Sequence, residues 1–178
     1  MIKRNLFGPL HSNIAHHLCR EGRIWLCWDA TYVHVQTLEE SNQLLHCKVT
    51  HLISNCQSLY TFIYASNCYV ERKTLWNHLT QISRTVVGPW TVGGDFNEVR
   101  NSHEKVGGRP PNVKRLKHFN DCIDSCRLME VHSSGNTLSW SNRQDTRIMG
   151  RLDRILANNA WLLLHPEATV VYHPPRAL

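Results

Sequence analysis

The sequence predicts an α/β fold made of two packed, largely antiparallel sheets with helices on the outside. Three observations support this prediction. The chain has 178 residues, which is enough for one substantial hydrophobic core. Short apolar runs separated by turn residues dominate it, and only two stretches show helical periodicity. Strand runs interrupted by so few helices are typical of layered sheets that helices cover from outside.

Composition places the chain among ordinary globular proteins. Hydrophobic residues make up 42% and charged residues 19%, which excludes a disordered or fibrous chain. No apolar run approaches the roughly 20 residues that a membrane span needs, and no signal-peptide core follows Met1–Asn5. The seven cysteines, an odd number without repeated C-x-x-C spacing, argue against a disulfide framework. We therefore expect an intracellular protein, nuclear or cytoplasmic, that does not contact a membrane.

The net charge favours a polyanionic partner. It is formally +6, and twelve histidines add to it at mildly acidic pH. We expect this partner to be a nucleic acid, and DNA is favoured over RNA by the family resemblance described below. Because the lysines and arginines are scattered, charge alone also allows an ordinary solvated basic surface.

Strands are expected to dominate the first half of the chain. Residues 1–21 show no clean period and are expected to be a lead-in to one domain over residues 22–178. Polar breaks then separate four strand-like runs, at residues 23–28, 32–38, 43–51 and 58–64. Their short links predict an antiparallel meander. Alternating side chains over residues 44–49 predict one solvated face and one buried face.

Two helices are expected in the rest of the chain. In residues 70–87, Leu75, Leu79 and Ile82 recur at helical steps until Gly88 and Pro89 end the pattern. A strand follows at once from Trp90. A second helix is expected over about 112–127, after a long loop through Gly107–Pro111. Further strands are expected at residues 137–141, 151–157 and 168–172.

The segment Pro89–Asn97 is the one that best indicates a function. Its apolar residues fit a buried strand, and its two glycines allow a tight turn or close approach to a ligand. Residues two apart in a strand share a face, so Asp95 and Asn97 are expected to point at one metal-bound phosphate. A plain turn, in which Asp and Asn bond backbone N–H groups, is the alternative.

Together with three other segments, Pro89–Asn97 resembles the endonuclease/exonuclease/phosphatase family, in the form carried by plant LINE-type retrotransposons. Those segments are Thr61–Asn67, Thr137–Asn142 and Arg151–Leu156. The resemblance covers nearly the whole chain and is specific as a set. It implies a four-layer α/β sandwich with the active site at one end of the paired sheets. It also implies a Mg²⁺-dependent phosphodiester hydrolase, an endonuclease of retroelement type.

The resemblance also implies roles for five residues. Asp95 corresponds to the family acid that orients or activates the attacking water, and Asn97 to the amide that contacts the scissile phosphate. Tyr64 and Asn67 match the family's Y-x-x-N segment, which lines the phosphate site. Asp153 matches an acid that orients a histidine. Oxygen ligands suit Mg²⁺, with Mn²⁺ as an alternative, and Asp95 is the ligand we expect.

Each of these residues also has a purely structural interpretation. Tyr64 fits an aromatic at a strand end, and Asn67 fits a turn residue. Asp153 fits an ion-pair partner of Arg151 or Arg154.

Two further residues are candidates for binding the substrate. Trp140 can stack on bases or sugars, although its neighbourhood in a strand pattern favours core packing. Arg109 opens a basic stretch at the start of the second helix and can grip a phosphate. A solvated helix face is the alternative for that stretch.

The chain departs from the family pattern at both ends. A complete member opens with a W-N segment and a metal-binding Glu, and closes with an S-D-H motif that supplies a catalytic histidine. Neither is found in this sequence. We therefore expect a partial domain, truncated at both ends and impaired as an enzyme. The alternative function is a non-catalytic, nucleic-acid-binding remnant of a retroelement.

Overall fold

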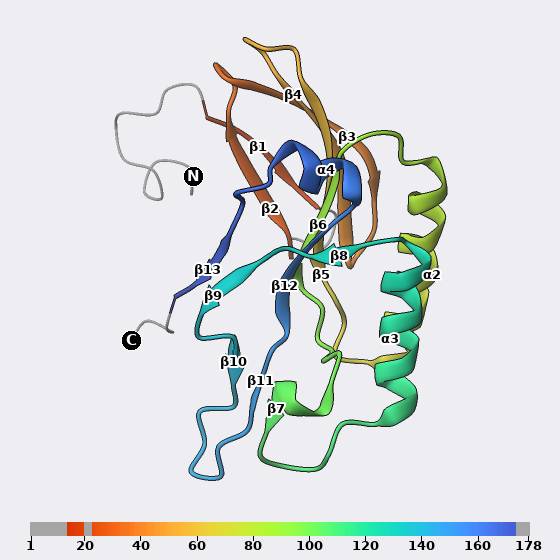
Figure 1. The fold of residues 1–178 in the computed structure, drawn as a ribbon, viewed down its shortest axis with the longest axis vertical. Coiled ribbons are helices and arrows are strands. Elements are labelled where there is room, and N and C mark those ends of the chain that lie inside the picture. The colour runs from red at the N-terminus through yellow and green to blue at the C-terminus, as the bar shows by residue number, and fades with distance from the viewer. Residues whose placement is uncertain (1–13, 20–22, 174–178) are drawn as a thin grey trace.

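The computed structural model describes residues 14–19 and 23–173 (Figure 1). Most of the expected lead-in over residues 1–21 therefore lies outside the described residues. Strand β1 (Ile14–Leu18) falls within that lead-in and pairs antiparallel with β2 (Trp25–Asp29). The expected domain boundary after residue 21 stays a prediction.

One mixed sheet of six strands forms the centre of the molecule, in the order β3-β4-β5-β6-β12-β8. Adjacent strands in this sheet pair antiparallel, except for β5 and β6, which pair parallel. The predicted meander is confirmed over β3, β4 and β5. The strands of this sheet are β3 (Val33–Glu40), β4 (Leu44–His51), β5 (Gln57–Tyr64), β6 (Trp90–Asp95), β12 (Asp153–Ala157) and β8 (Met129–Glu130).

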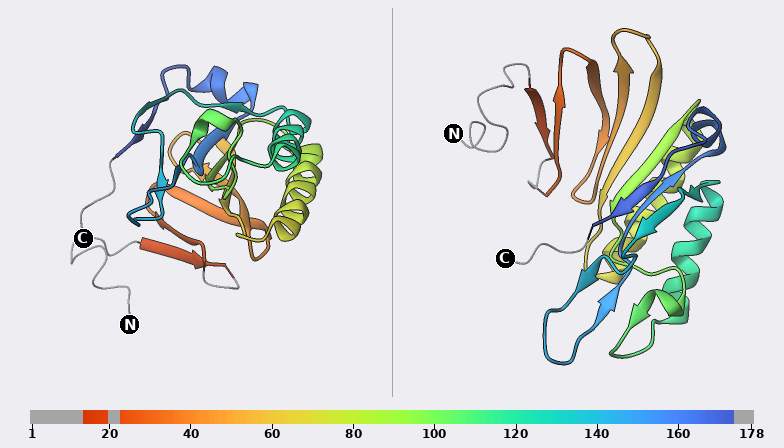
Figure 2. Two further views of the ribbon diagram at one scale, coloured as in Figure 1. Left: turned by 90° about the horizontal axis from the view of Figure 1, so that it is seen from below. Right: turned by 60° about the vertical axis from the view of Figure 1, so that its left-hand side comes forward.

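Helices α2 (Tyr69–Thr85) and α3 (Val113–Ser125) cover one face of this sheet (Figure 2). Helix α2 makes the crossover that a parallel pairing of β5 and β6 requires. Its apolar stripe is buried as predicted. The core between helices and sheet contains Leu44, Ile63, Ala65, Leu75, Trp76, Leu79, Ile82, Trp90, Val92, Phe96, Phe119, Cys122, Ile123, Cys126, Leu128 and Leu156.

The opposite face of the sheet carries the β1–β2 pair as a second, smaller layer (Figure 2). Cys19 and Ile24 pack there against Leu45. The predicted solvated face of β4 is therefore wrong, because the four residues from Leu44 to Cys47 are all buried. Strand β4 lies inside the sheet, with helices on one side and the β1–β2 layer on the other.

Short elements complete the structure around this centre. Strands β10 (Trp140–Ser141), β11 (Met149–Gly150) and β7 (Lys105–Val106) form one small sheet. Strands β9 (Ser133–Gly135) and β13 (Val170–Tyr172) form another. A 3₁₀ turn at Ser102–Glu104 precedes β7, and helix α4 (Asn159–Leu164) follows β12.

The α/β class, with largely antiparallel sheets and outer helices, is confirmed. The strands expected at 137–141, 151–157 and 168–172 are present but shorter. Among the residues described, no helix has the length and apolar character to cross a membrane.

Candidate active site

Three of the predicted site residues lie in one row across the central sheet. Tyr64 ends β5, Asp95 ends β6 and Asp153 begins β12. Asp95 is in register with Tyr64 on one side and with Asp153 on the other. Side chains in register point to the same face, and Trp90 and Val92 of β6 belong to the helix-side core. Asp95 and its two neighbours therefore point away from the helices.

The carboxyl group of Asp95 is partly withdrawn from water. Burial raises its pKa, the backbone N–H of Asn97 opposes that rise, the charge of Asp153 adds to it, and Arg72 opposes it. The N–H of Asn97 donates to Oδ1 of Asp95 at 2.8 Å, so Oδ2 does not take part in that bond. Asp95 therefore holds its negative charge less readily than an ordinary aspartate.

Asn97 reaches the site through a turn and not through strand alternation. Strand β6 ends at Asp95, and Asn97 has a positive φ of 47°. The shared strand face predicted for Asp95 and Asn97 is wrong for this reason. The N–H of Asn97 closes a turn on Asp95, as the alternative interpretation proposed, and its Nδ2 donates to the carbonyl of Ala65 at 2.6 Å. This second bond ties Asn97 to the loop that follows Tyr64.

The glycine before Asp95 is required by the neighbouring strand. Gly94 has φ of 136°, and a Cβ there would lie 2.0 Å from the carbonyl oxygen of Ile63. A side chain at position 94 would therefore separate β6 from β5. This close approach holds Tyr64 and Asp95 side by side.

Arg72 joins the two loops that carry the candidate asparagines. From the first turns of α2 its Nη1 donates to the carbonyls of Ser66 (2.8 Å) and Asn67 (3.0 Å). Its Nη2 donates to Oε2 of Glu98 at 2.7 Å. Both side chains are buried, although a charged residue on a surface helix and one in a loop carry no sequence signal of burial. Sequence reasoning missed this pair.

A second group of bonds fixes the loop after Tyr64. The N–H of Ser66 donates to the side chain of Gln43 at 2.8 Å, and its hydroxyl donates to Glu71 at 2.5 Å. Gln43 in turn donates to the carbonyl of Glu71 at 3.0 Å. The loop that contains Asn67 is therefore fixed by hydrogen bonds to Glu71 of helix α2, which follows it, and to Gln43 in the turn before β4.

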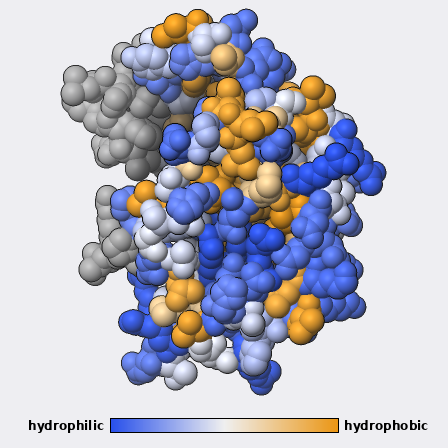
Figure 3. Space-filling view, in the orientation of Figure 1, coloured by the Kyte–Doolittle hydropathy of each residue, from blue (hydrophilic) through white to orange (hydrophobic). Residues whose placement is uncertain are grey.

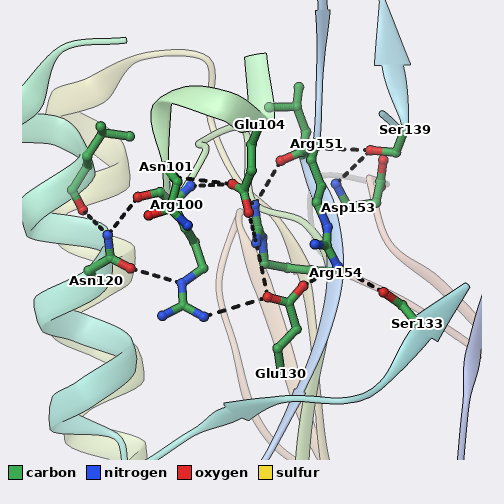
Figure 4. A network of polar contacts seen from close by, with 12 residues as sticks. Arg100, Asn101, Glu104, Asn120, Glu130, Ser133, Ser139, Arg151, Asp153 and Arg154 are labelled. Carbon is green, nitrogen blue, oxygen red and sulfur yellow. Dashed lines mark hydrogen bonds and ion pairs between the residues drawn. The ribbon is translucent and has the colours of Figure 1, made fainter. Parts of the chain in front are cut away.

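The arginines beside Asp153 are engaged elsewhere (Figure 4). Arg154 is fully buried and donates to both carboxylate oxygens of Glu104, at 3.2 and 2.9 Å. Arg151 pairs with Glu130. The interpretation of Asp153 as a partner of Arg151 or Arg154 is therefore wrong. Within the described part of the chain, the carboxylate of Asp153 has no ion-pair or hydrogen-bond partner, so it is available to a ligand.

These ion pairs also hold the backbone of β12 in place. Burial disfavours the charge on Glu104, but the hydrogen bonds and charge of Arg154, with the N–H groups of Arg100 and Asn101, outweigh it and lower its pKa. The hydroxyl of Ser139 accepts the N–H of Asp153 at 3.0 Å on the other side of the strand (Figure 4). Asp153 is therefore anchored through its main chain.

Asn67 borders an open cavity at the end of β5. The cavity holds about 440 Å³ and is lined by Arg23, Tyr64, Ala65 and Asn67. Both Tyr64 and Asn67 are exposed there. No role for Arg23 was predicted from the sequence.

The two predicted substrate-binding residues lie apart from this row. Trp140 is on β10 and 44% exposed, so the interpretation of it as a core residue is wrong. Arg109 is exposed in the loop between β7 and α3, where its carbonyl accepts Nζ of Lys105 at 2.5 Å. That loop touches the β10–β11 segment, because a Cβ on Gly107 would lie 2.4 Å from the carbonyl of Arg147. This end of the molecule is mainly hydrophilic in Figure 3.

The acids of the row suit a hard divalent cation. Asp95 and Asp153 are paired in register, their charges disfavour one another, and only one carboxylate oxygen of Asp95 is used by its own turn. Mg²⁺ in proteins commonly uses one or two carboxylates and completes its shell with water and substrate phosphate. No group of three or more metal-binding His, Cys, Asp or Glu side chains occurs in the described ranges 14–19 and 23–173. The residues present fit a cation held by two acids.

Comparison with known proteins identifies structural relatives only. No family model matches the sequence, and no curated protein does. The endonuclease domain of TRAS1, a telomere-specific non-LTR retrotransposon, superposes with a TM-score of 0.63 at 12% identity, covering 85% of this chain and 68% of that one. A mannosyl-6-phosphatase of Bacteroides thetaiotaomicron superposes with a TM-score of 0.51 at 10% identity, covering 84% and 64%. Such distant likenesses show a shared fold.

Proposed function

We propose that this chain, which has the endonuclease/exonuclease/phosphatase fold, hydrolyses phosphodiester bonds in nucleic acid with the help of Mg²⁺. The observation that carries the proposal is the row of Tyr64, Asp95 and Asp153 on one face of the sheet. Asn97 and Asn67 join this row from loops that Arg72 holds together. Two acids beside a phenol and two amides match the needs of phosphodiester hydrolysis.

Each residue has a defined task in this proposal. Asp95 orients the attacking water, and with Asp153 it would hold the Mg²⁺ ion that makes this water easier to deprotonate. One N–H of the Asn97 amide is used by Ala65, and the other donates to a phosphate oxygen. A Mg²⁺ ion held by Asp95 and Asp153, with Mn²⁺ as a substitute, would neutralise negative charge on that phosphate.

A retroelement endonuclease is the specific type we propose. The fold likeness to the TRAS1 endonuclease domain supports this assignment, and the net charge of +6 suits a DNA substrate. The exposed Trp140, with Arg109 in the loop that follows β7, would provide a surface for base stacking and phosphate binding apart from the row of acids.

Nicking of supercoiled plasmid tests the proposal. Purified protein should convert supercoiled to open-circular DNA with Mg²⁺ and not with a chelator. Asp95→Ala should abolish nicking, whereas Asp121→Ala, which removes an exposed acid on α3, should leave it intact. Nicking that survives Asp95→Ala would assign the activity to a contaminant. No nicking by folded protein would overturn the proposal.

The second candidate function is nucleic-acid binding without catalysis. The exposed Trp140 favours it, together with the basic loop that packs beside it. Binding of a labelled oligonucleotide would then weaken steeply with salt and ignore both Mg²⁺ and Asp95→Ala. If the chain is catalytic, nicking should instead require Mg²⁺ and be lost in Asp95→Ala.

A further inference from the structure

Two thiols lie one helical turn apart at the end of α3. Cys122 and Cys126 are each only 5% exposed and belong to the core under the helices. Their thiols hydrogen-bond to one another, and each sulfur lies 4.0 Å from the hydroxyl oxygen of Thr80 on α2. The thiol of Cys122 also donates to the carbonyl of Trp76 at 3.5 Å. The neighbouring helix therefore holds this pair of thiols in place.

A cavity between α2 and α3 gives access to the pair. The two helices lie side by side (Figure 1), and the cavity between them holds about 420 Å³. Cys122 and Thr80 are among the residues that line it, so an ion or a small thiol compound can reach Cys122 from solvent. The row of acids points away from the helices. The thiol pair is therefore separate from the candidate active site.

The spacing of the two thiols suits a bridging cation better than a disulfide. Cβ atoms one helical turn apart are separated by about 5–6 Å, whereas a disulfide needs about 3.5–4.5 Å. Closing a disulfide would therefore distort the last turn of α3. Two metal–sulfur bonds of about 2.3 Å each, the value for zinc, can bridge sulfurs up to about 4.6 Å apart. A cation between the sulfurs leaves the helix geometry unchanged.

Two thiols without further ligands select a soft monovalent cation. A structural zinc ion needs four ligands, but no group of three or more metal-binding side chains occurs in the part of the chain that the structure describes. Two other candidate ligands at the cavity have partners of their own. His118 Nδ1 lies 2.5 Å from the hydroxyl of Tyr69, and Asp121 accepts Nζ of Lys117. Thiolates prefer soft cations such as Cu⁺, which is stable with two of them in a line.

We propose that Cys122 and Cys126 together bind one Cu⁺ ion as a pair of thiolates. The ion replaces the two thiol protons, which pass to solvent, so two S–H bonds give way to two S–Cu bonds. No electron is transferred, and copper must therefore arrive already reduced. The hydrogen bond with Cys126 and burial both raise the pKa of Cys122, so this thiol keeps its proton until a cation displaces it. The complex has one net negative charge, and Lys73 lines the adjoining cavity with a charge of opposite sign.

Competition for Cu⁺ tests this inference on the full chain. Protein loaded anaerobically with one equivalent of Cu⁺ is mixed with a large excess of glutathione, and the copper that stays with the chain is measured after gel filtration. Glutathione competes well against single exposed thiols such as Cys56 and Cys68, but not against a chelating pair. The wild type should keep one Cu⁺ per chain. In a bathocuproine disulfonate titration, Cys122→Ser and Cys126→Ser should each raise the Kd at least about a hundredfold.

Matched variants and two further measurements complete the test. Cys56→Ser and Cys68→Ser, which remove exposed thiols, should bind Cu⁺ as the wild type does. Ag⁺, a soft cation that needs no reducing agent, should raise the melting temperature of the wild type but not of Cys122→Ser or Cys126→Ser. X-ray absorption at the copper edge should show two sulfur ligands and no nitrogen. Equal melting temperatures of the metal-free variants exclude a folding defect.

Three results would overturn the proposal. The first is loss of Cu⁺ from the wild type to glutathione, which needs no variant to interpret. The second is retention of Cu⁺ by Cys122→Ser or Cys126→Ser, because a single thiol would then suffice. The third is a nitrogen ligand in the absorption spectrum, which would assign the ion to a histidine and so to a different site.

Discussion

Arg72 and Glu98 form a buried ion pair of 2.7 Å that joins the start of α2 to the loop after β6. The same guanidinium bonds the carbonyls of Ser66 and Asn67. The two loops that supply the candidate asparagines are thus held by a single side chain. Loss of the Arg72 side chain should therefore displace both loops that carry the candidate asparagines, although Arg72 is not itself one of the candidate site residues.

Replacing Arg72 should lower the free energy of unfolding, mainly because the buried Glu98 then lacks its ion-pair partner. Arg72→Met leaves Glu98 buried without its partner, and we expect a loss of about 3 kcal/mol in the free energy of unfolding. Arg72→Met/Glu98→Met removes the stranded charge and should be more stable than Arg72→Met alone by at least about 1 kcal/mol. Urea unfolding followed by tryptophan fluorescence gives these values. Arg84→Met, on the exposed end of the same helix, should change them by less than about 0.5 kcal/mol. Simple additivity of the Arg72→Met and Glu98→Met effects would show that the two residues do not act as a pair.

Binding of Mg²⁺ should be visible without any catalytic turnover. A cation that binds only the folded chain raises the free energy of unfolding by about 1.4 kcal/mol at ten times its Kd. We expect a thermal shift with Mg²⁺ that is lost in Asp95→Asn and in Asp153→Asn. Asp121→Asn should keep the shift, since that acid is exposed on α3. A shift that persists without both row acids would place the cation elsewhere.

Trp140 should matter for binding and not for folding. Its ring is 44% exposed on a two-residue strand, so Trp140→Ala should change the free energy of unfolding by less than about 0.5 kcal/mol. Loss of one stacked base should weaken oligonucleotide binding by about 1–3 kcal/mol. Trp25→Ala, which removes a similarly exposed tryptophan on β2, is the control. Equal binding by both variants would exclude stacking on Trp140.

Stability should fall in mild acid because of His46. Burial lowers the pKa of His46 below 6.5, with the charge of Glu39 opposing, and its Nδ1 lies 2.8 Å from the hydroxyl of Thr61. Just below pH 6.5, His46 is therefore protonated in the unfolded chain but stays largely neutral in the folded chain. The free energy of unfolding should fall by up to about 1.4 kcal/mol per pH unit, until the lower native pKa is reached.

His46→Gln should remove this slope while His132→Gln, at an exposed position, should keep it. Chemical denaturation at several pH values between 5 and 7.5 makes the comparison. An unchanged slope in His46→Gln would assign the acid sensitivity to other groups.

The position of Asp95 could be predicted from local sequence, because it depends on where an apolar strand ends. The apolar run that stops at two glycines predicted Asp95 at the end of a strand, whereas Asp153 was predicted from the family resemblance of Arg151–Leu156. Tyr64 was likewise predicted at the end of a strand, because the polar residues Ser66 and Asn67 follow its apolar run. What the local pattern did not contain was register, which aligns these three residues in one row. Asn97 was expected beside Asp95 by strand alternation and reaches it by a turn.

The residues that hold the site had no local signal. Arg72 and Glu98 look like solvated charges until α2 is packed on the sheet, and Arg23 comes from the separate β1–β2 layer. The small strands β7, β8 and β11 have two residues each, too few to show a period. Long-range packing decides all of these features, so they appear only in the assembled structure.

The parallel pairing of β5 with β6 has a consequence for the order in which the chain folds. Residues 57–97 form a strand, a crossover helix and a strand, and they contain Tyr64, Asn67, Asp95 and Asn97. Asp153 joins by pairing β12 with β6 across a much longer stretch of sequence, and closing longer loops slows folding. We therefore expect the β5–α2–β6 unit, which contains four of the five candidate residues, to form before β12 pairs with β6 and adds the second acid.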